Sequence, residues 1–241
     1  MWLTGNIFGT VSVIDEEKSL KVSFQTSIGD ATGTSPMCKL ACGMIREMRI
    51  AEVSRKTKET DIYIKLNLDG TGKSDICTGI GFFDHMLISF AKHSFIDLEV
   101  KVKGDLQVDG HHTVEDTGIV LGEAIKQALG DKAGIKRYGS SILPMDETLV
   151  LAAVDFCGRP YLNYNLTFTM SRIGELDSEL IREFFYAVSY SAAMNLHIKQ
   201  LDGTNCHHIA EAAFKAFAKA VDEAKTVDPR VSGTLSTKGS L

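Results

Sequence analysis

Residues 111–115 read His-His-Thr-Val-Glu, and residues 207–211 read His-His-Ile-Ala-Glu. In each stretch the first histidine and the glutamate are four residues apart, so a helix would place them on one face. The second histidine is turned by about 100° from the first, so one pair can serve two different metal ions. The recurrence of the pattern indicates an internal duplication, with helices predicted over residues 111–129 and 207–224.

The sequence around these two stretches repeats in the same order. Residues 58–60 (Lys-Glu-Thr) match residues 146–148 (Asp-Glu-Thr), and residues 83–86 match residues 181–184, which makes Glu183 the counterpart of His85. Alternation and periodicity predict strands over 61–68, 96–102, 149–156, 161–168 and 196–201, and helices over 82–90 and 178–193. Each half therefore reads as a β-hairpin, a helix, a strand and a second helix, which is an α+β architecture.

Length and composition are those of an ordinary globular protein. The 241 residues carry a net charge of −5 and are 44% hydrophobic, which excludes collagen-like and disordered classes and leaves no basic surplus for nucleic-acid binding. No apolar run is long enough for a membrane helix, and no secretory signal precedes the five cysteines, so we interpret them as reduced thiols of a cytoplasmic protein. Residues 1–47 are expected to be an extension, disordered or outside the core, with repeat units over 48–134 and 135–241.

Histidines and glutamates at equivalent positions of the two halves are candidate metal ligands. Imidazole nitrogens mixed with carboxylate oxygens suit Mn, Fe, Co or Zn and disfavour Mg and Ca. The candidates could hold two ions and leave coordination positions open, which favours catalysis over a structural role. A structural role fits the isolated His93 and His197 better, and the predicted strands argue against a four-helix di-iron protein. The candidate ligands are His85, His111, His112, Glu115, Glu183, His207, His208 and Glu211.

Six stretches of the chain resemble the imidazoleglycerol-phosphate dehydratase family, which acts in histidine biosynthesis. They include Gly-Phe-Phe-Asp-His-Met-Leu at 81–87, Asp-Gly-His-His-Thr-Val-Glu-Asp at 109–116 and Ser-Thr-Lys-Gly at 236–239. The resemblance runs from Arg49 to the end of the chain. The six stretches are residues 69–72, 78–87, 109–116, 158–162, 207–212 together with 214–216, and 236–239.

This resemblance implies two repeats of a ferredoxin-like unit of the ribosomal protein S5 domain 2 type. It also implies trimers that build a 24-subunit shell, two Mn²⁺ per active site at subunit interfaces, and neither nucleic acid nor membrane as a partner. The implied reaction is that of a hydro-lyase, in which D-erythro-imidazole-glycerol phosphate loses water and becomes imidazole-acetol phosphate. Since the proton to be removed is not next to a carbonyl group, the ions would act as Lewis acids and orient the substrate.

The matching positions carry roles over to residues of this chain. Glu59 stands at the position of an acid/base group that touches the substrate, and His85 and Glu183 count as catalytic residues as well as metal ligands. Glu183 occupies a position where other family members can carry a histidine. The positions that hold the substrate phosphate are Arg137, Arg159, Lys215, Ser236, Thr237 and Lys238, although no proline stands between Leu235 and Ser236 as the family pattern has it.

The division of the ligands between two ions follows from helix geometry and pseudo-symmetry. His111 with Glu115 is expected to share one ion, and His207 with Glu211 the other. His112 and His208 would cross over to the opposite ion, with His85 and Glu183 completing the two sets.

Two other functions stay open from the residues alone. A binuclear phosphate-ester hydrolase on the same duplicated scaffold would release free phosphate, whereas a dehydratase leaves the ester intact. A shell in which metals only join subunits would show closed coordination and no turnover, and would give the basic residues near the C-terminus no purpose.

Overall fold

The computed structural model describes residues 11–14, 21–24 and 49–241, and the chain divides into two units, residues 1–47 and 48–241. In the first unit, β1 (Val11–Ile14) and β2 (Lys21–Phe24) pair as an antiparallel ribbon. The remainder of the extension that the sequence predicts over residues 1–47 lies outside the described residues. Within the described parts of the chain, no helix is both long and apolar enough to cross a bilayer.

The first half of the second unit is a four-stranded sheet with two helices. Its elements are β3 (Ile50–Lys56), β4 (Thr60–Asn67), β5 (Ser74–Cys77), α2 (Gly81–Ser94), β6 (Asp97–Gly104) and α3 (His111–Leu129). The strands lie in the order β3-β4-β6-β5, antiparallel except for the parallel pair β5 and β6. Buried and less buried residues alternate along β4, because its apolar side chains face the helices.

The second half repeats this topology. Its elements are β7 (Tyr138–Met145), β8 (Thr148–Asp155), β9 (Tyr161–Asn165), β10 (Arg172–Ile173), β11 (Leu176–Asp177), α4 (Leu180–Ser191), β12 (Asn195–Asp202) and α5 (Cys206–Lys225). The sheet order is β7-β8-β12-β9, again with one parallel pair, β9 and β12, while β10 and β11 form a short separate ribbon. The α+β class and the duplication are therefore confirmed.

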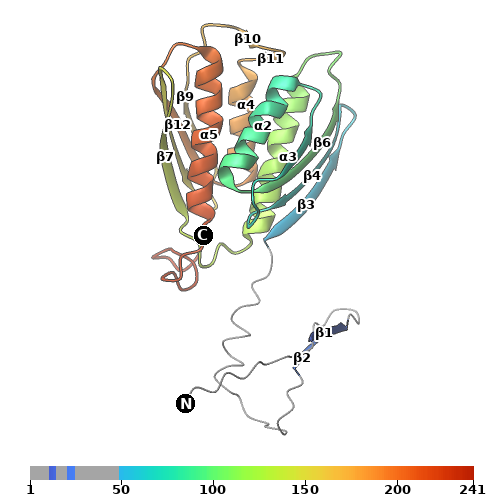
Figure 1. Ribbon diagram of the computed structural model, residues 1–241, viewed down its shortest axis with the longest axis vertical. Coiled ribbons are helices and arrows are strands. Elements are labelled where there is room, and N and C mark those ends of the chain that lie inside the picture. The colour runs from blue at the N-terminus through green and yellow to red at the C-terminus, as the bar shows by residue number, and fades with distance from the viewer. Residues whose placement is uncertain (1–10, 15–20, 25–48) are drawn as a thin grey trace, which may run out of the picture. The chain divides into compact units, whose positions relative to one another are not determined.

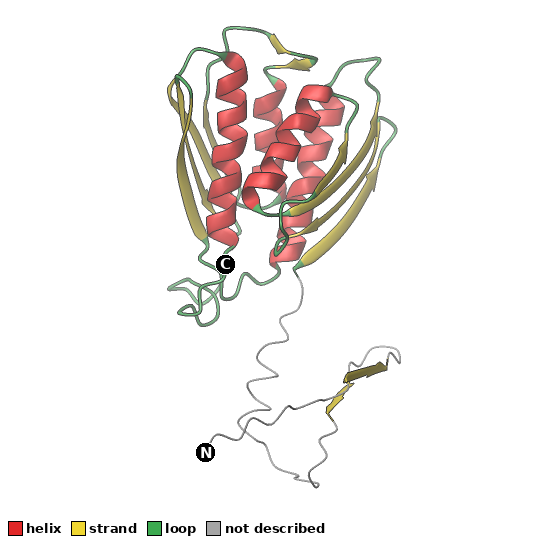
Figure 2. Ribbon diagram, in the orientation of Figure 1, coloured by secondary structure: helices red, strands yellow, loops and turns green. Residues whose placement is uncertain are grey.

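The four helices form a layer between the two sheets (Figures 1 and 2). Within this layer α3 packs against α4, and α2 packs against α5. Two glycines allow the close approach of α3 and α4: a Cβ added at Gly118 would lie 2.8 Å from the Cβ of Ala187, and one added at Gly122 would lie 2.7 Å from the Cβ of Ser191. Helices of the two halves thus pair across the duplication, which brings histidines and carboxylates of distant segments together.

Some strands differ from the sequence expectation. The hairpins are β3–β4 and β7–β8, and the strand after Pro160 does not pair with its predecessor β8 but lies parallel to β12. It also ends at Asn165 rather than at residue 168. Periodicity overlooked β7, which is an edge strand that carries Gly139 and Pro144 and therefore lacks a strand-like composition.

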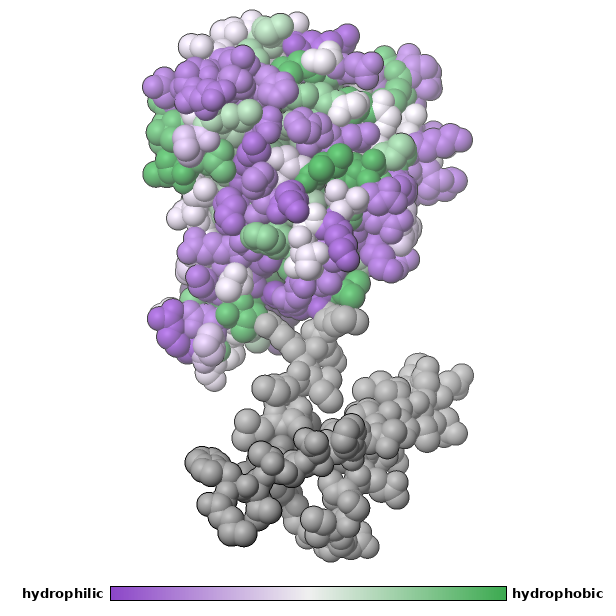
Figure 3. All heavy atoms as spheres, viewed as in Figure 1, coloured by the Kyte–Doolittle hydropathy of each residue, from purple (hydrophilic) through white to green (hydrophobic). Residues whose placement is uncertain are grey.

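The surface of the second unit is mixed in character. Hydrophilic side chains cover most of the face drawn in Figure 3, with separate hydrophobic side chains between them. The buried core is dominated by phenylalanines between the sheets, including Phe184, Phe185, Phe214 and Phe217. The candidate metal ligands lie in the first two turns of the four helices, which this core holds in place.

Candidate metal centre

Each histidine pair lies in the first turn of a helix, where a nearby side chain accepts hydrogen bonds from the backbone N–H groups. The Oδ1 of Asn205 accepts hydrogen bonds from the backbone N–H of His207 (2.9 Å) and of His208 (3.3 Å) at the start of α5. The Oδ1 of Asp109 accepts one from the backbone N–H of His111 (2.8 Å) at the start of α3. These bonds satisfy N–H groups that a first helical turn leaves unpaired, so both pairs stand on well-formed first turns.

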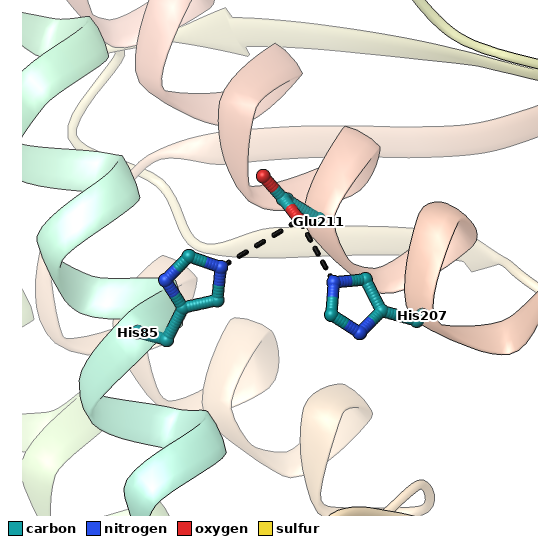
Figure 4. Close-up of side chains that lie close together, drawn as sticks. All are labelled: His85, His207 and Glu211. Atoms are coloured by element: carbon teal, nitrogen blue, oxygen red, sulfur yellow. Dashed lines mark hydrogen bonds and ion pairs between the residues drawn. The ribbon is translucent and has the colours of Figure 1, made fainter.

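Three of the predicted ligands come together in this chain. The Oε2 of Glu211 lies 3.0 Å from Nε2 of His207 and 3.6 Å from Nε2 of His85 (Figure 4). One donor atom from each of the three residues fits within 4.8 Å of the others. His85 reaches the group from α2, which packs against α5. The sequence made His85 a candidate ligand through its match with Glu183 and through the family resemblance, and the structure brings it to His207 and Glu211 of the other half of the duplication.

The carboxylate of this group is charged and buried. Burial alone would favour the neutral acid, but hydrogen bonds from Lys215 and His207 hold the pKa of Glu211 below its ordinary value. The Nζ of Lys215 lies 2.7 Å from the Oε1 of Glu211, so the second oxygen has its own cationic partner. Oε2 is therefore an anionic donor that faces the two imidazole rings.

The equivalent residues of the first half are more loosely arranged. The Nε2 of His111 lies 3.5 Å from the Oε2 of Glu115 on α3. Glu183 lies on α4 and forms an ion pair with its neighbour Arg182, with 2.9 Å between Nη1 and Oε1. Within residues 11–14, 21–24 and 49–241, only His85, His207 and Glu211 form a group of three metal donors.

The second histidine of each pair faces carboxylates with both ring nitrogens. For His112, Nδ1 lies 3.0 Å from Asp105 Oδ2 and Nε2 lies 3.9 Å from Glu59 Oε2. The hydrogen bond with Asp105 raises the pKa of His112. The expected crossing of His112 to the opposite ion stays a prediction.

The second half presents the same surroundings with different residues. For His208, Nδ1 lies 2.7 Å from Glu147 Oε2 and Nε2 lies 3.6 Å from Asp146 Oδ2. The hydrogen bond with Glu147 raises the pKa of His208. The same bond, together with backbone N–H donors, lowers the pKa of Glu147 to about 2. Like that of His112, the crossing of His208 stays a prediction.

A basic hollow lies at the C-terminal tail. It has a volume of about 800 Å³, and its lining includes all of the predicted phosphate-binding residues except Lys215. The Nε and Nη2 of Arg137 donate to the two oxygens of Asp155 at 2.7 and 3.1 Å, and Nη1 donates to the backbone oxygen of Leu235 at 2.8 Å. These bonds fix the guanidinium at the wall of the hollow. The predicted residues in the lining are Arg137, Arg159, Ser236, Thr237 and Lys238.

Several residues of these sites were missed at the sequence level. Asp105, Asp146 and Glu147 contact the second histidines, and Arg230 lines the basic hollow. The match between residues 58–60 and 146–148 contained the signal for Glu147, because it set this residue beside Glu59. Lys215, which the resemblance assigns to the phosphate, pairs with Glu211 in this chain, and its role toward the phosphate stays a prediction.

Comparison with known proteins adds a family. A family model described as imidazoleglycerol-phosphate dehydratase matches residues 78–221. The chain is 69% identical to the imidazoleglycerol-phosphate dehydratase of Lachnoclostridium phytofermentans over 193 residues, which cover 80% of this chain and 98% of the relative. It is 60% identical to that of Acetivibrio thermocellus over 190 residues, covering 79% and 97%.

Solved structures agree with these relatives. The crystal structure of imidazoleglycerol-phosphate dehydratase from Staphylococcus aureus is 40% identical with a TM-score of 0.68, covering 74% of this chain and 99% of that chain. The enzyme from Pyrococcus furiosus, solved in complex with (S)-C348, is 39% identical with a TM-score of 0.68, covering 78% and 100%.

Proposed function

This chain belongs to the imidazoleglycerol-phosphate dehydratase family, and from that premise we propose that it dehydrates D-erythro-imidazole-glycerol phosphate to imidazole-acetol phosphate with two Mn²⁺ per active site. The family makes the chain a hydro-lyase of histidine biosynthesis with a phosphorylated imidazole as its substrate. The metal, the course of the reaction and the assembly are the parts that we propose.

The observation that carries the proposal is the convergence of His85, His207 and Glu211 from two helices. Two imidazole nitrogens and an anionic oxygen fit Mn²⁺, and the donor set is the kind that leaves coordination positions for a substrate. His111 and Glu115 are the corresponding donors of the first half, with Glu183 as the counterpart of His85. When bound, the ions would supply Lewis acidity that withdraws electrons from the imidazole of the substrate.

Glu59 is the residue that we propose to move protons. The reaction removes the hydroxyl group from the carbon beside the imidazole ring and a proton from the next carbon, which together make one water molecule. The enol that remains takes up a proton at the ring-side carbon, loses the proton of its hydroxyl group and becomes the ketone. The Glu59 side chain is 54% exposed and 3.9 Å from Nε2 of His112, so a carboxylate stands within reach of the second histidine and of solvent.

The basic hollow would hold the substrate phosphate. Arg137 is oriented by Asp155, and Arg159 and Lys238 add positive charge to the same lining. Hydroxyl groups of Ser236 and Thr237 add hydrogen-bond donors for phosphate oxygens. Lys215 joins them only if the substrate spans from the hollow to Glu211, which is part of the proposal.

We also propose trimers that assemble into a 24-subunit shell in the cytoplasm. The support is that one chain brings only three of the predicted ligands into a donor group, while others such as His111 and Glu115 stay about two-fifths exposed. A second subunit that covers these residues would complete both metal sites.

The deciding experiment is an assay on chelator-treated protein with and without added Mn²⁺. We expect imidazole-acetol phosphate to form from imidazole-glycerol phosphate only after Mn²⁺ is restored, with no release of inorganic phosphate. Release of phosphate would identify a hydrolase instead. If no product formed although Mn²⁺ was bound, the result would favour the non-catalytic alternative, a shell in which the metal only joins subunits.

A further inference from the structure

The second histidine of each pair is held by a carboxylate at the same ring nitrogen. Asp105 Oδ2 lies 3.0 Å from Nδ1 of His112, and Glu147 Oε2 lies 2.7 Å from Nδ1 of His208. An ionised carboxylate only accepts hydrogen bonds, so the hydrogen of each neutral ring must sit on Nδ1. The lone pair of each ring is then on Nε2, which is the atom left to bind a metal ion.

These two carboxylates come from different places in the duplicated fold. Glu147 stands in the turn between β7 and β8, where the first half has Glu59. Asp105 instead follows Gly104, the last residue of β6, which lies opposite Thr60 of β4. The two halves therefore reach the same ring nitrogen from positions that the duplication does not relate.

The second half offers no equivalent of Asp105. Its glycine beside the corresponding threonine is Gly203, where a Cβ would lie 2.3 Å from Oγ1 of Thr148. The next residue is Thr204, whose backbone N–H donates to Oε1 of Glu147 at 3.2 Å. Thr204 thus supports the glutamate that holds His208 and supplies no carboxylate of its own.

The Asp105 side chain has no other hydrogen bond in the described part of the chain. Its Oδ1 is buried and lacks a partner, and the side chain is 15% exposed. A buried oxygen without a partner lowers the stability of the fold, so packing alone does not explain an aspartate at this position. Its contact with His112 does.

We propose that Asp105 and Glu147 are positioning residues that keep the hydrogen of His112 and His208 on Nδ1 and turn Nε2 of each ring toward a metal ion, an inference that rests on the proposed function for the presence of the metal. Neither residue touches the substrate. In each half, one carboxylate fixes the tautomer and the orientation of one ligand before the ion arrives. Partners of this kind change metal affinity by about 10- to 100-fold in other metalloproteins.

The first test reads the hydrogen positions directly in the metal-free full chain. Protein with ¹⁵N-labelled histidine is studied by magic-angle-spinning NMR at about pH 8.5, where the neutral rings predominate. Spectra of His112→Gln and His208→Gln assign the signals. We expect both rings to carry their hydrogen on Nδ1. A hydrogen on Nε2 of either ring overturns the role of its carboxylate, and this result does not require a folded Asp105 or Glu147 variant.

The second test is titration with Mn²⁺ alone, followed by calorimetry. Asp105→Asn and Glu147→Gln keep the size of each side chain and remove its charge, and each is expected to raise the Kd of one ion by about 10- to 100-fold. Asp75→Asn is the matched control, because Asp75 is an exposed carboxylate on β5 that pairs with Lys101. The control is expected to bind like the unchanged chain.

An unchanged Kd in a folded Asp105→Asn or Glu147→Gln variant would remove that residue from the role. Neither measurement requires turnover. A chain that shows both expected results but forms no imidazole-acetol phosphate would refute the proposed function and leave the positioning of the two histidines intact.

Discussion

The two hairpin turns of the second unit carry a glutamate at the same place and hold it in opposite ways. Glu147 accepts hydrogen bonds from the backbone N–H groups of Thr204 (3.2 Å) and Asn205 (2.8 Å), and from the hydroxyl of Thr148 (3.1 Å). Its other oxygen holds His208. The Glu59 side chain has a single polar contact among the described residues, 3.9 Å to Nε2 of His112. One duplicated position is thus an anchor in one half and an unrestrained carboxylate in the other.

The surroundings of the turns explain this difference. In the first half the hydroxyl of Thr60 donates to Oδ2 of Asp116 at 2.5 Å, and Asp116 also pairs with Arg55. In the second half Ala212 stands at the position of Asp116, and Thr148 turns its hydroxyl to Glu147 instead. Because Asp105 holds His112 and Asp116 holds Thr60, the Glu59 side chain accepts no hydrogen bond from the described residues of the first half. Since the Glu59 carboxylate does not hold another side chain in place, it is available for proton transfer.

Removal of the second histidines tests whether the halves are equal in metal binding despite their different turns. We expect His112→Ala and His208→Ala each to lower activity by more than about 100-fold and to reduce the amount of bound Mn²⁺. Loss of a residue that only supports a metal ligand costs about 10- to 100-fold, and loss of the ligand itself should cost more. Metal analysis and turnover assays measure both effects. His197→Ala is the control, because this histidine contacts the ring of Tyr161 on the sheet. Full activity with full Mn²⁺ content in either variant would show that His112 and His208 do not contribute equally to metal binding.

The pH dependence should be shared by both halves, because each second histidine has a carboxylate partner. Those partners raise the pKa of His112 and His208 above 6.5, so both rings take up a proton at a higher pH than an ordinary histidine. A protonated ring offers no lone pair, so Mn²⁺ affinity and activity should begin to fall above pH 6.5 as the pH is lowered.

The sign is opposite for the metal-free protein. The ion pairs with His112 and His208 stabilise its fold below the unfolded pKa and lose this effect as the pH rises past the raised pKa. Thermal unfolding of the metal-free chain should therefore show a higher Tm at about pH 6 than at about pH 8.5. A Tm independent of pH over this range would show that the contacts do not form in solution.

Loss of Asp116 should make the first turn behave differently from its counterpart. Asp116→Ala leaves Thr60 and Arg55 without their partner, and we expect the free energy of unfolding to fall by about 1–3 kcal/mol. We also expect kcat to fall, since the turn that carries Glu59 is loosened. Urea unfolding and turnover measure the two effects, with Asp75→Ala as a control that should stay within about 0.5 kcal/mol. An unchanged free energy of unfolding would show that Asp116 does not account for the difference between the two turns.

The smallest effect is expected outside the duplicated halves. A chain that begins at Met48 retains both histidine pairs, both turns and the basic hollow. Turnover, Mn²⁺ content and particle size in solution should all equal those of the full chain. Loss of any of them would show that residues 1–47 take part in the function and that the two repeat halves are not sufficient for it.

Sequence patterns predicted the parts of this molecule that depend on neighbours along the chain. The histidine pairs lie in the first turns of α3 and α5 as expected, because helical spacing is a local signal. The duplication was also visible, since residues 58–60 and 146–148 match directly. The edge strand β7 was not visible in the sequence, because its glycine and proline interrupt the alternation of polar and apolar residues that marks a strand.

The contacts that distinguish the two halves could not be predicted in this way. Asp105 reaches His112 because the register of β4 and β6 sets Gly104 opposite Thr60, and register is a property of the folded sheet. His85 joins His207 and Glu211 because α2 packs against α5 of the other half. Such pairings arise from packing between helices that lie more than a hundred residues apart in the sequence.

The most direct measurement compares kcat and the Kd for Mn²⁺ in Glu59→Gln and Glu147→Gln, which make the same change at the same position of the two halves. For Glu59→Gln we expect kcat to fall by about 10²- to 10⁴-fold with Mn²⁺ affinity near normal. For Glu147→Gln we expect the larger change in Mn²⁺ affinity, about 10- to 100-fold, with kcat largely recovered at saturating Mn²⁺. If both variants lost kcat to the same extent at saturating Mn²⁺, or neither did, the two glutamates would not differ in function.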